Sequence, residues 1–450
     1  MSSQVKFSSK LATVLVAAGC SVGLGNIWRF PYVAGENGGG AFLLIYLACI
    51  LIIGFPVMMS ELAIGRATHL SAVGAFRQLA PRWKWLGYNG VLAAFLILGF
   101  YYVVAGWTAE YFIFSVTGEL SKLSTTAEYS TLFTDFITHP ARPILYTWIF
   151  VALTHAIIFL GVQKGLEKVS NVLMPLLFII LIALAINSIL LPNSWEGVKF
   201  FLYPDFSKIT PQAFLQAVGQ AFFSLSIGLG ALIAYGSYVP RDANLRTTTF
   251  QVMGLDTAVA LLAGLIIFPA TASVGIDPTA GPALVFETLP AIFNMLPMSG
   301  LWASIFFLLL VIAAITSTMS LHEVATVFFM EEFKLTRKRG ALLTSVIVGV
   351  LGTAASLSLC VPSMEGYTPL FDMLDYVTAN IMLPLGGMMT CIFVGWKIDK
   401  KVYSDQITNF GKNKCGYLPV LIFLLKYICP ILIFIVFLDS AGIFNMFYNN

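Results

Sequence analysis

The 450-residue chain is 58% hydrophobic and only 10% charged, with a mean hydropathy of +0.87. A soluble domain carries about 25% charged residues, so this composition excludes an ordinary soluble protein and predicts a chain embedded in a bilayer. The 25 basic and 22 acidic residues nearly balance, so lipid rather than nucleic acid is the expected partner.

Apolar segments of the length that crosses a bilayer, about 20 residues, recur along the whole sequence. We predict an all-α polytopic membrane protein with about eleven transmembrane helices in a single domain, 1–450. The predicted spans are 10–35, 41–65, 86–117, 143–161, 167–191, 211–238, 248–274, 300–330, 340–360, 369–396 and 417–440. The first apolar run continues as a full span, which argues against a cleavable signal.

Basic residues gather in the loops on one predicted side of these spans. The opposite loops hold only Lys122, Arg142, Lys199 and Lys208. Because basic loops stay in the cytoplasm, we predict a cytoplasmic N-terminus and, with an odd number of spans, an extracytoplasmic C-terminus. A miscounted last span would move only the C-terminus. The sequence has no Asn-x-Ser/Thr acceptor, which favours the inner (plasma) membrane of a prokaryote.

The first span contains an interruption at membrane depth. Gly19, Gly23 and Gly25 weaken the helix there, and Arg29 follows directly. Irregular backbone at this depth is tolerated where protein or an aqueous cavity satisfies its polar groups, and transporters build substrate and ion sites from such broken helices. Glycines that only allow close helix packing are the alternative, but the neighbouring polar residues favour a transport site.

A second interruption, 224–230, opens the sixth span. Corresponding breaks in two halves of a membrane protein indicate a repeat, and an odd number of spans in each repeat inverts its topology. We therefore predict inverted five-helix repeats at 10–191 and 211–396, with broken helices 1 and 6. The span 417–440 is an additional helix outside this symmetry.

Polar groups inside later spans mark further candidate residues. Asp256 lies well within the seventh span with no basic neighbour in sequence, so a bound cation or a proton is its expected partner. Four hydroxyl residues at 316–320 can bond back to their own helix or supply oxygen ligands to Na⁺. Asp372 and Asp375 begin the tenth span and can cap that helix or pair with Arg29.

Two segments remain open from sequence alone. The apolar stretch 288–293 can fold back as a plug or pack as a loop on the surface. Gly165 and Pro175 bracket the start of the fifth span, where they produce either a kink or a segment that unwinds. Six scattered cysteines and four histidines show no spacing for a disulfide framework or a metal site.

Together these motifs resemble the neurotransmitter:sodium symporter family, whose prototype fold is that of the bacterial leucine transporter. The resemblance rests on 23–31, 36–42 and 219–228 and covers the chain to about residue 400. The lack of a twelfth span resembles a bacterial subset that transports hydrophobic amino acids, and Gly165 and Pro175 match its Gly-x9-Pro element.

The resemblance implies positions for ions, substrate and gates. The first Na⁺ site would use Ser21, Asn26, Ser224 and Asp256, and the second Gly19, Val22, Ala313, Thr316 and Ser317. The substrate site would use Cys20, Ser21, Leu24, Gly25, Ile97, Tyr101, Phe223, Ser224, Ser226, Leu229, Ser317 and Leu321. The outer gate would use Arg29, Gln220, Phe223 and Asp375, and the inner gate Tyr238 and Glu331.

Several positions depart from the family's pattern. Asp256 stands where the prototype has Asn, and Ala260 where chloride-independent bacterial members often have Glu. Leu229 replaces a bulkier Phe, which widens the expected pocket. Gly23 occupies the position of the Asp that binds the amine in monoamine carriers. Gln4 replaces a basic residue of the inner gate.

We therefore expect a sodium-coupled symporter that imports amino acids, with hydrophobic or aromatic L-amino acids as substrates, by alternating access and without chloride. No enzyme activity and no cofactor beyond Na⁺ as coupling ion are expected, and a monomer would suffice, although an oligomer is compatible. A sodium-independent or proton-linked transporter of the same fold is the alternative. An amino-acid sensor, from a different class, is disfavoured because no signalling domain is recognisable.

Overall fold

The computed structural model describes residues 7–275, 285–295, 298–361, 367–413 and 415–440. Within these ranges the secondary structure is helical, with one isolated bridge between Gly39 and Pro204 and no strand. Among the described residues, nine helices are long and apolar enough to cross a membrane. They are Gly40–Thr68, Pro81–Val116, Arg142–Phe159, Val162–Ile189, Leu245–Val274, Ser299–Glu332, Arg337–Ser358, Leu370–Lys397 and Leu418–Asp439.

Two further spans are interrupted. The first consists of α1 (Lys10–Ser21) and the segment Gly25–Glu36, whose axes differ by 55°. The other consists of α11 (Pro211–Ser224) and α12 (Ala231–Gly236), separated by non-helical residues. The predicted all-α fold is confirmed, and each of the eleven predicted spans coincides with a helix or an interrupted pair.

Short π-helical turns divide some of the continuous spans into two named α-helices, as in Gly40–Thr68, which contains α3 and α4. The named α-helices of the continuous spans are α3 (Gly40–Cys49), α4 (Phe55–Thr68), α6 (Lys84–Val116), α8 (Arg142–Phe159), α9 (Lys168–Ile189), α13 (Leu245–Val274), α15 (Ser299–Glu332), α16 (Arg337–Ser358), α17 (Leu370–Tyr376), α18 (Leu383–Ile392), α20 (Leu418–Phe423) and α21 (Cys429–Ser440). The short helices between spans are α5 (Ala72–Leu79), α7 (Thr126–Ile137), α10 (Trp195–Leu202), α14 (Thr288–Asn294) and α19 (Lys400–Ile407).

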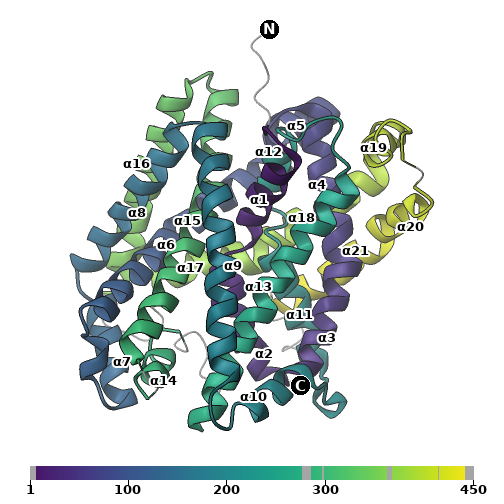
Figure 1. The fold of residues 1–450 in the computed structure, drawn as a ribbon. Helices are drawn as coiled ribbons and strands as arrows, with labels where there is room; N and C mark the ends of the chain where they lie inside the picture. The colour runs from purple at the N-terminus through teal and green to yellow at the C-terminus, as the bar shows by residue number, and fades with distance from the viewer. Residues whose placement is uncertain (1–6, 276–284, 296–297, 362–366, 414, 441–450) are drawn as a thin grey trace.

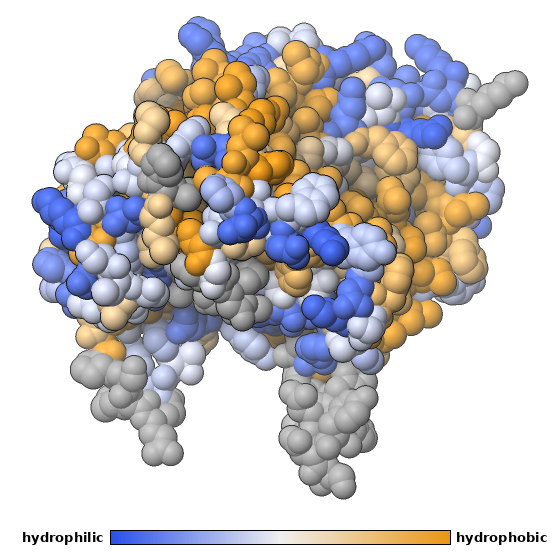
Figure 2. Space-filling model, turned by 60° about the horizontal axis from the view of Figure 1, so that its bottom comes forward, coloured by the Kyte–Doolittle hydropathy of each residue, from blue (hydrophilic) through white to orange (hydrophobic). Residues whose placement is uncertain are grey.

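The spans form a bundle with two distinct ends (Figure 1). The start of α1 lies at the end that carries α5, α12 and α19, which we call the N-terminal end. Helices α7, α10 and α14 lie at the opposite end. Hydrophobic side chains cover broad areas of the flank, whereas hydrophilic side chains gather toward the ends (Figure 2). This distribution is the one a bilayer around the flank would require.

Glycine permits the close approach that holds the second broken helix in place. A Cβ at Gly65 of α4 would collide with the carbonyl of Ile233, and one at Gly236 would lie 2.5 Å from the carbonyl oxygen of Leu62. Helices α4 and α12 therefore meet backbone to backbone, as small residues allow in membranes. This contact fixes the half-helix that follows the second break.

The segment 288–293 folds into the protein instead of lying on its surface. Leu289 and Ile292 are fully buried in α14, and Phe293 is nearly so. Just before it, the ring of Phe286 lies against the rings of Trp28, Trp107 and other aromatic residues. The structure thus favours the plug over the surface loop.

Candidate transport site

The two breaks face each other and exchange hydrogen bonds. The Ser226 hydroxyl donates to the Cys20 carbonyl (3.0 Å), and the Ser21 hydroxyl donates to the Leu225 carbonyl (3.3 Å). Each serine side chain thereby bonds to a carbonyl that the other interrupted helix leaves without a helical partner. Ser226 itself has a left-handed φ of 53°, which lets the chain turn within the second break.

Side chains from the first broken span and from intact helices satisfy other backbone groups of the breaks. The Leu24 amide donates to the Tyr101 hydroxyl (3.2 Å), and the Gly23 amide donates to Asn26 Oδ1 (3.2 Å). In the second break the Gly228 amide donates to Glu61 Oε1 (2.8 Å). The unwound backbone thus lies among protein groups, as membrane depth demands.

The first predicted sodium site is a buried cluster around Asp256. Asn26 Nδ2 donates to Asp256 Oδ1 (2.8 Å), and the Ser224 hydroxyl donates to Asp256 Oδ2 (2.7 Å). The Tyr46 hydroxyl donates to Ser224 Oγ (3.1 Å). Asp256 is fully buried, and no Lys or Arg of the described ranges lies within 4.0 Å of its carboxylate. A buried carboxylate among neutral oxygens suits a small hard cation.

The second predicted sodium site lies where α1 meets α15. Thr316 Oγ1 donates to the Ala313 carbonyl (2.9 Å) and lies 3.4 Å from the Val22 carbonyl, as does Ser317 Oγ. Gly19 faces the same place, since a Cβ there would lie 3.6 Å from Thr316 Cβ. The five residues predicted for this site therefore come together, and they offer only uncharged oxygens.

Most residues predicted for the substrate line one small cavity between the breaks. This cavity is lined by Cys20, Ser21, Gly23, Gly25, Ile97, Tyr101, Phe223, Ser226, Leu229, Ser317, Leu321 and Leu383. Leu24 lines the neighbouring outer cavity instead, and Ser224 lies in the Asp256 cluster. Leu383 was not predicted from sequence because an apolar residue in a span carries no polar signal.

Gly23 keeps the substrate cavity free of a side chain at the first break. A Cβ there would collide with Ser317 Oγ and lie 3.1 Å from the Tyr101 hydroxyl. The position that carries an Asp in monoamine carriers therefore has no room for one in this arrangement. The first break therefore presents no charged side chain of its own to the cavity at this position.

An outer cavity adjoins the substrate cavity, and Phe223 lines both. The Arg29 guanidinium lies over the Phe223 ring, 4.8 Å from its centroid. Asp375 lines the same outer cavity, but within the described ranges it makes no ion pair with Arg29 inside 4.0 Å. Gln220 Nε2 donates to the Gly25 carbonyl (3.2 Å). The four predicted outer-gate residues are thus near one another without forming the expected ion pair.

At the N-terminal end the two predicted inner-gate residues have separate partners. The Tyr238 hydroxyl donates to Glu323 Oε1 (2.9 Å), and Arg337 donates to both oxygens of the same carboxylate (2.9 and 2.5 Å). Glu323 is fully buried. The Phe7 amide donates to the Tyr238 carbonyl (3.2 Å), so the chain before α1 covers this network.

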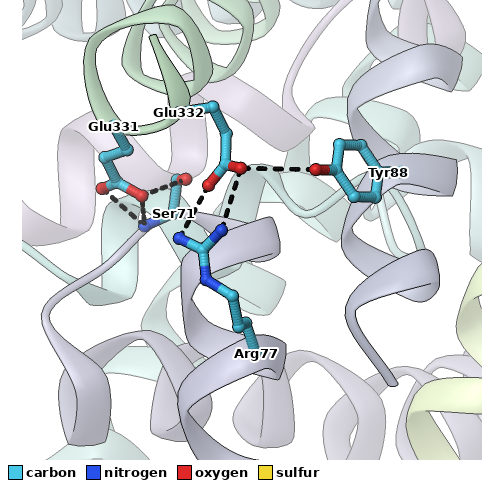
Figure 3. Close-up of polar contacts among 5 residues, drawn as sticks. All are labelled: Ser71, Arg77, Tyr88, Glu331 and Glu332. Carbon is cyan, nitrogen blue, oxygen red and sulfur yellow. Dashed lines mark hydrogen bonds and ion pairs between the residues drawn. The ribbon is translucent and has the colours of Figure 1, made fainter. Parts of the chain in front are cut away.

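Glu331 instead holds α5 against the end of α15 (Figure 3). Its carboxylate accepts from the Ser71 amide (2.9 Å) and the Ser71 hydroxyl (2.5 Å). The adjacent Glu332 pairs with Arg77 of α5 and accepts from the Tyr88 hydroxyl (3.3 Å). Two neighbouring acids thus bind one short helix.

Gly165 and Glu167 fix the start of the fifth span. Gly165 lies in a π-helical turn, Val162–Glu167, and a Cβ there would collide with the Ile157 carbonyl. The Ser8 amide and hydroxyl both donate to the Glu167 carboxylate. Pro175 lies inside α9. This segment is therefore wound as a π-helical turn while the N-terminal end is closed.

Sequence reasoning overlooked Glu61 and Glu323. Both are carboxylates inside spans, and such residues mark functional sites by default. The same rule that selected Asp256 could have selected them, since each lies well within an apolar segment. Arg337, the partner of Glu323, was recognised only as a basic residue of a loop.

The comparisons with known proteins agree with this geometry. The family model described as "Sodium:neurotransmitter symporter family" matches residues 4–142 and 133–450. YhdH, a sodium-dependent transporter of Bacillus subtilis, is 39% identical over 448 residues that cover 98% of each chain.

The chain belongs to the sodium:neurotransmitter symporter family.

Two other symporter relatives bear on the site. The crystal structure of MhsT in complex with L-phenylalanine is similar with a TM-score of 0.88 and 42% identity, over 97% of this chain and 100% of that one. The human sodium- and chloride-dependent GABA transporter 2 is 28% identical over 92% of this chain and 75% of its own. Membership of the symporter family makes this chain a sodium-coupled multi-pass membrane transporter and not an enzyme.

Proposed function

We propose that this transporter imports hydrophobic or aromatic L-amino acids together with Na⁺, at two sodium sites, and without chloride. The observation that carries the proposal is the cavity between the breaks. One part of its wall carries hydroxyls, at Ser21, Tyr101, Ser226 and Ser317. Leucine, isoleucine and phenylalanine side chains form much of the rest, so the cavity suits a zwitterion with an apolar side chain.

The apolar wall provides the selectivity. Ile97, Leu229 and Leu321 line the cavity, and burial of a large apolar side chain contributes about 1.5–3 kcal/mol. That difference favours apolar over polar amino acids by tenfold or more. The complex of MhsT with L-phenylalanine, a protein 42% identical to this chain, supports the same substrate class.

Radiolabelled uptake into proteoliposomes tests the substrate proposal. We expect L-phenylalanine, L-tryptophan or L-leucine to accumulate only with an inward sodium gradient. Preferential uptake of dopamine or glutamate over every apolar amino acid would overturn the substrate class. Uptake that is equal without sodium would support the sodium-independent alternative, and uptake driven by a proton gradient alone would support the proton-linked one.

Chloride independence rests on Asp256. In a chloride-dependent carrier an anion near the sodium site offsets the charge of the cation, and here the Asp256 carboxylate lies among Tyr46, Ser224 and Asn26. At an effective dielectric constant near 20, opposite unit charges about 4 Å apart attract by roughly 4 kcal/mol before desolvation. A fixed carboxylate of that strength makes a mobile anion redundant.

Replacement of chloride by gluconate tests this part of the proposal. We expect full uptake by the wild-type protein in gluconate, and weaker sodium binding with partial chloride dependence in Asp256→Asn. Asp135→Asn, the same change at an exposed site on α7, is the matched control and should alter neither property. Strict chloride dependence of the wild-type protein would refute the charge argument.

The orientation proposed for this carrier places the N-terminal end of the bundle in the cytoplasm and the C-terminus outside. The distribution of basic residues supports it. Protease or thiol-reagent access to tags at each terminus in intact cells distinguishes this orientation from its inverse.

A further inference from the structure

We propose that Lys426, Trp396 and Tyr427 form a binding site for the headgroup of an anionic phospholipid at the N-terminal end of the last span. Lys426 Nζ lies 3.9 Å from the centroid of the Trp396 ring and 5.5 Å from that of Tyr427. The two rings contact each other at 5.6 Å. The ammonium is therefore held between two aromatic faces.

The site lies at the level of the membrane interface. Trp396 is the penultimate residue of the span Leu370–Lys397, and Trp is enriched where a span leaves the hydrocarbon. Lys426 follows Leu418, the first residue of the last span, by eight positions, or roughly 12 Å of helix. Its side chain reaches Trp396 and thereby brings the charge to the interface, as long basic side chains do.

The Lys426 ammonium makes no ion pair with the part of the chain that the structure describes. No Asp or Glu of the described ranges lies within 4.0 Å of Lys426 Nζ. The indole Nε1 of Trp396 donates to the Lys426 carbonyl (3.1 Å), so it is already used. Two exposed lysines, Lys397 and Lys400, lie close to Trp396 in the sequence. Asp399, the acid between these two lysines, accepts from the Lys401 amide (2.8 Å), so the Lys426 ammonium stays available to a phosphate.

The aromatic groups face outward, where acyl chains would lie. Trp396 is 59% exposed, Tyr427 41% and Phe423 52%, and the Phe423 and Tyr427 rings are 5.5 Å apart. On a helix whose flank meets lipid, this exposed apolar surface lies directly beside the charge. An anionic phospholipid matches both features, because its phosphate can bind the ammonium while its acyl chains pack against the rings.

The backbone keeps the site in one geometry. A Cβ at Gly395 would lie 2.8 Å from Lys426 Cα, so only a glycine allows the two spans to approach this closely. With the indole bonded to the Lys426 carbonyl, both the ring and the base of the lysine side chain are fixed. A preformed site loses less entropy when it binds a lipid.

The competing explanation is that Lys426 only clasps the two spans together. Native mass spectrometry of the purified full chain in detergent, titrated with palmitoyl-oleoyl phosphatidylglycerol, separates the two ideas. We expect Lys426→Gln to bind the first phosphatidylglycerol about fivefold more weakly than wild type, the effect of removing one basic group near a charged surface. Lys426→Arg should retain binding, and palmitoyl-oleoyl phosphatidylcholine should bind both proteins equally.

Lys338→Gln is the matched control. Lys338 Nζ also lies over an aromatic ring, 4.7 Å from the centroid of Phe159, at the end of a different span, so the variant loses the same charge and the same kind of contact. It should bind phosphatidylglycerol like wild type. The proposal is overturned if Lys426→Gln binds this lipid as wild type does, if Lys338→Gln weakens binding equally, or if inorganic phosphate displaces the lipid.

Discussion

The two ends of the substrate cavity are closed in different ways. On the outer side Phe223 lies between the substrate cavity and the outer cavity, together with Tyr101 and Gly25, and Arg29 covers the Phe223 ring through a cation–ring contact of 4.8 Å. On the inner side Glu323 lies fully buried and holds Arg337 and Tyr238 together. One closure depends on a side chain that can rotate, and the other on a desolvated ion pair.

This difference indicates which closure opens more easily from the described state. Rotation of a half-buried ring breaks few contacts, whereas separation of Glu323 from Arg337 would leave a buried carboxylate with no positive partner and only the Tyr238 hydroxyl as a hydrogen-bond donor. The strength of a buried pair is most apparent when one member is removed. In the described state the N-terminal end is therefore held by a buried ion pair, and the opposite end of the substrate cavity is only lightly covered.

The largest effect is expected from Arg337→Ala. Loss of one partner leaves Glu323 buried and uncompensated, at a cost of about 3–5 kcal/mol to the closed inner end. Tyr235 lies behind this closure, 1% exposed and 6.3 Å from the Phe7 ring. A cysteine-free chain carrying Tyr235→Cys reports its opening, and we expect maleimide to label it at least tenfold faster in the Arg337→Ala variant.

Arg77→Ala is the control for this experiment. Arg77 also pairs with a glutamate at the N-terminal end, Glu332, but its side chain is 47% exposed, and exposed pairs contribute about 0–1 kcal/mol. The labelling rate should change less than twofold. Equal acceleration by the two variants would show that general loosening of this end, and not the buried pair, controls access.

An intermediate effect is expected from Gly25→Ala, which perturbs the outer closure. A Cβ at residue 25 would lie 2.7 Å from Phe223 Cε1 and 2.8 Å from Cδ1. The ring must rotate toward the outer cavity, since overpacking of this kind costs about 1–3 kcal/mol. We expect equilibrium binding of the transported amino acid to weaken about tenfold while the inner labelling rate stays unchanged.

Gly219→Ala distinguishes a local clash from a general effect of a methyl group. Gly219 lies on α11, the helix that carries Phe223, and a Cβ there meets no atom within 4 Å. This variant should bind substrate like wild type. If Gly25→Ala binds as tightly as Gly219→Ala, Phe223 does not cover the substrate and the outer closure lies elsewhere.

The contrast between the two ends also shows what the sequence could predict. The breaks and spans follow from glycine placement and apolar length, which are local properties, and the structure confirms them. Asp256 could be predicted as a site residue because a carboxylate within an apolar span is unusual. The partners of Tyr238 could not be assigned, because Glu323 and Glu331 lie two turns apart on α15 and only packing decides which one faces it.

The outer gate illustrates a second limit, which is conformational state. Sequence and resemblance place Arg29 and Asp375 as a pair, and both line the outer cavity, yet in the described state Arg29 lies over Phe223. A motif lists residues that meet at some point of a cycle without saying when. The pairing therefore stays a prediction for the state in which substrate is enclosed.

The smallest effect is expected from Asp375→Asn, which tests that pairing. If the two residues pair only while substrate is enclosed, the variant should slow uptake about threefold, as loss of a partly solvated pair worth 0.5–1 kcal/mol would. The loss should shrink at high ionic strength, because salt screens charges in a wet cavity. Uptake rates at low and high salt, compared with those of wild type, measure both effects.

Asp372→Asn decides whether the effect belongs to a specific pair. Asp372 lies one turn earlier on α17, is exposed and lines the same outer cavity, so its removal changes the charge of that cavity equally. A specific Arg29–Asp375 gate predicts near-normal uptake in Asp372→Asn. If the two variants slow uptake equally, the cavity acts only through its net charge, and Phe223 with its Arg29 cover is the whole of the outer closure.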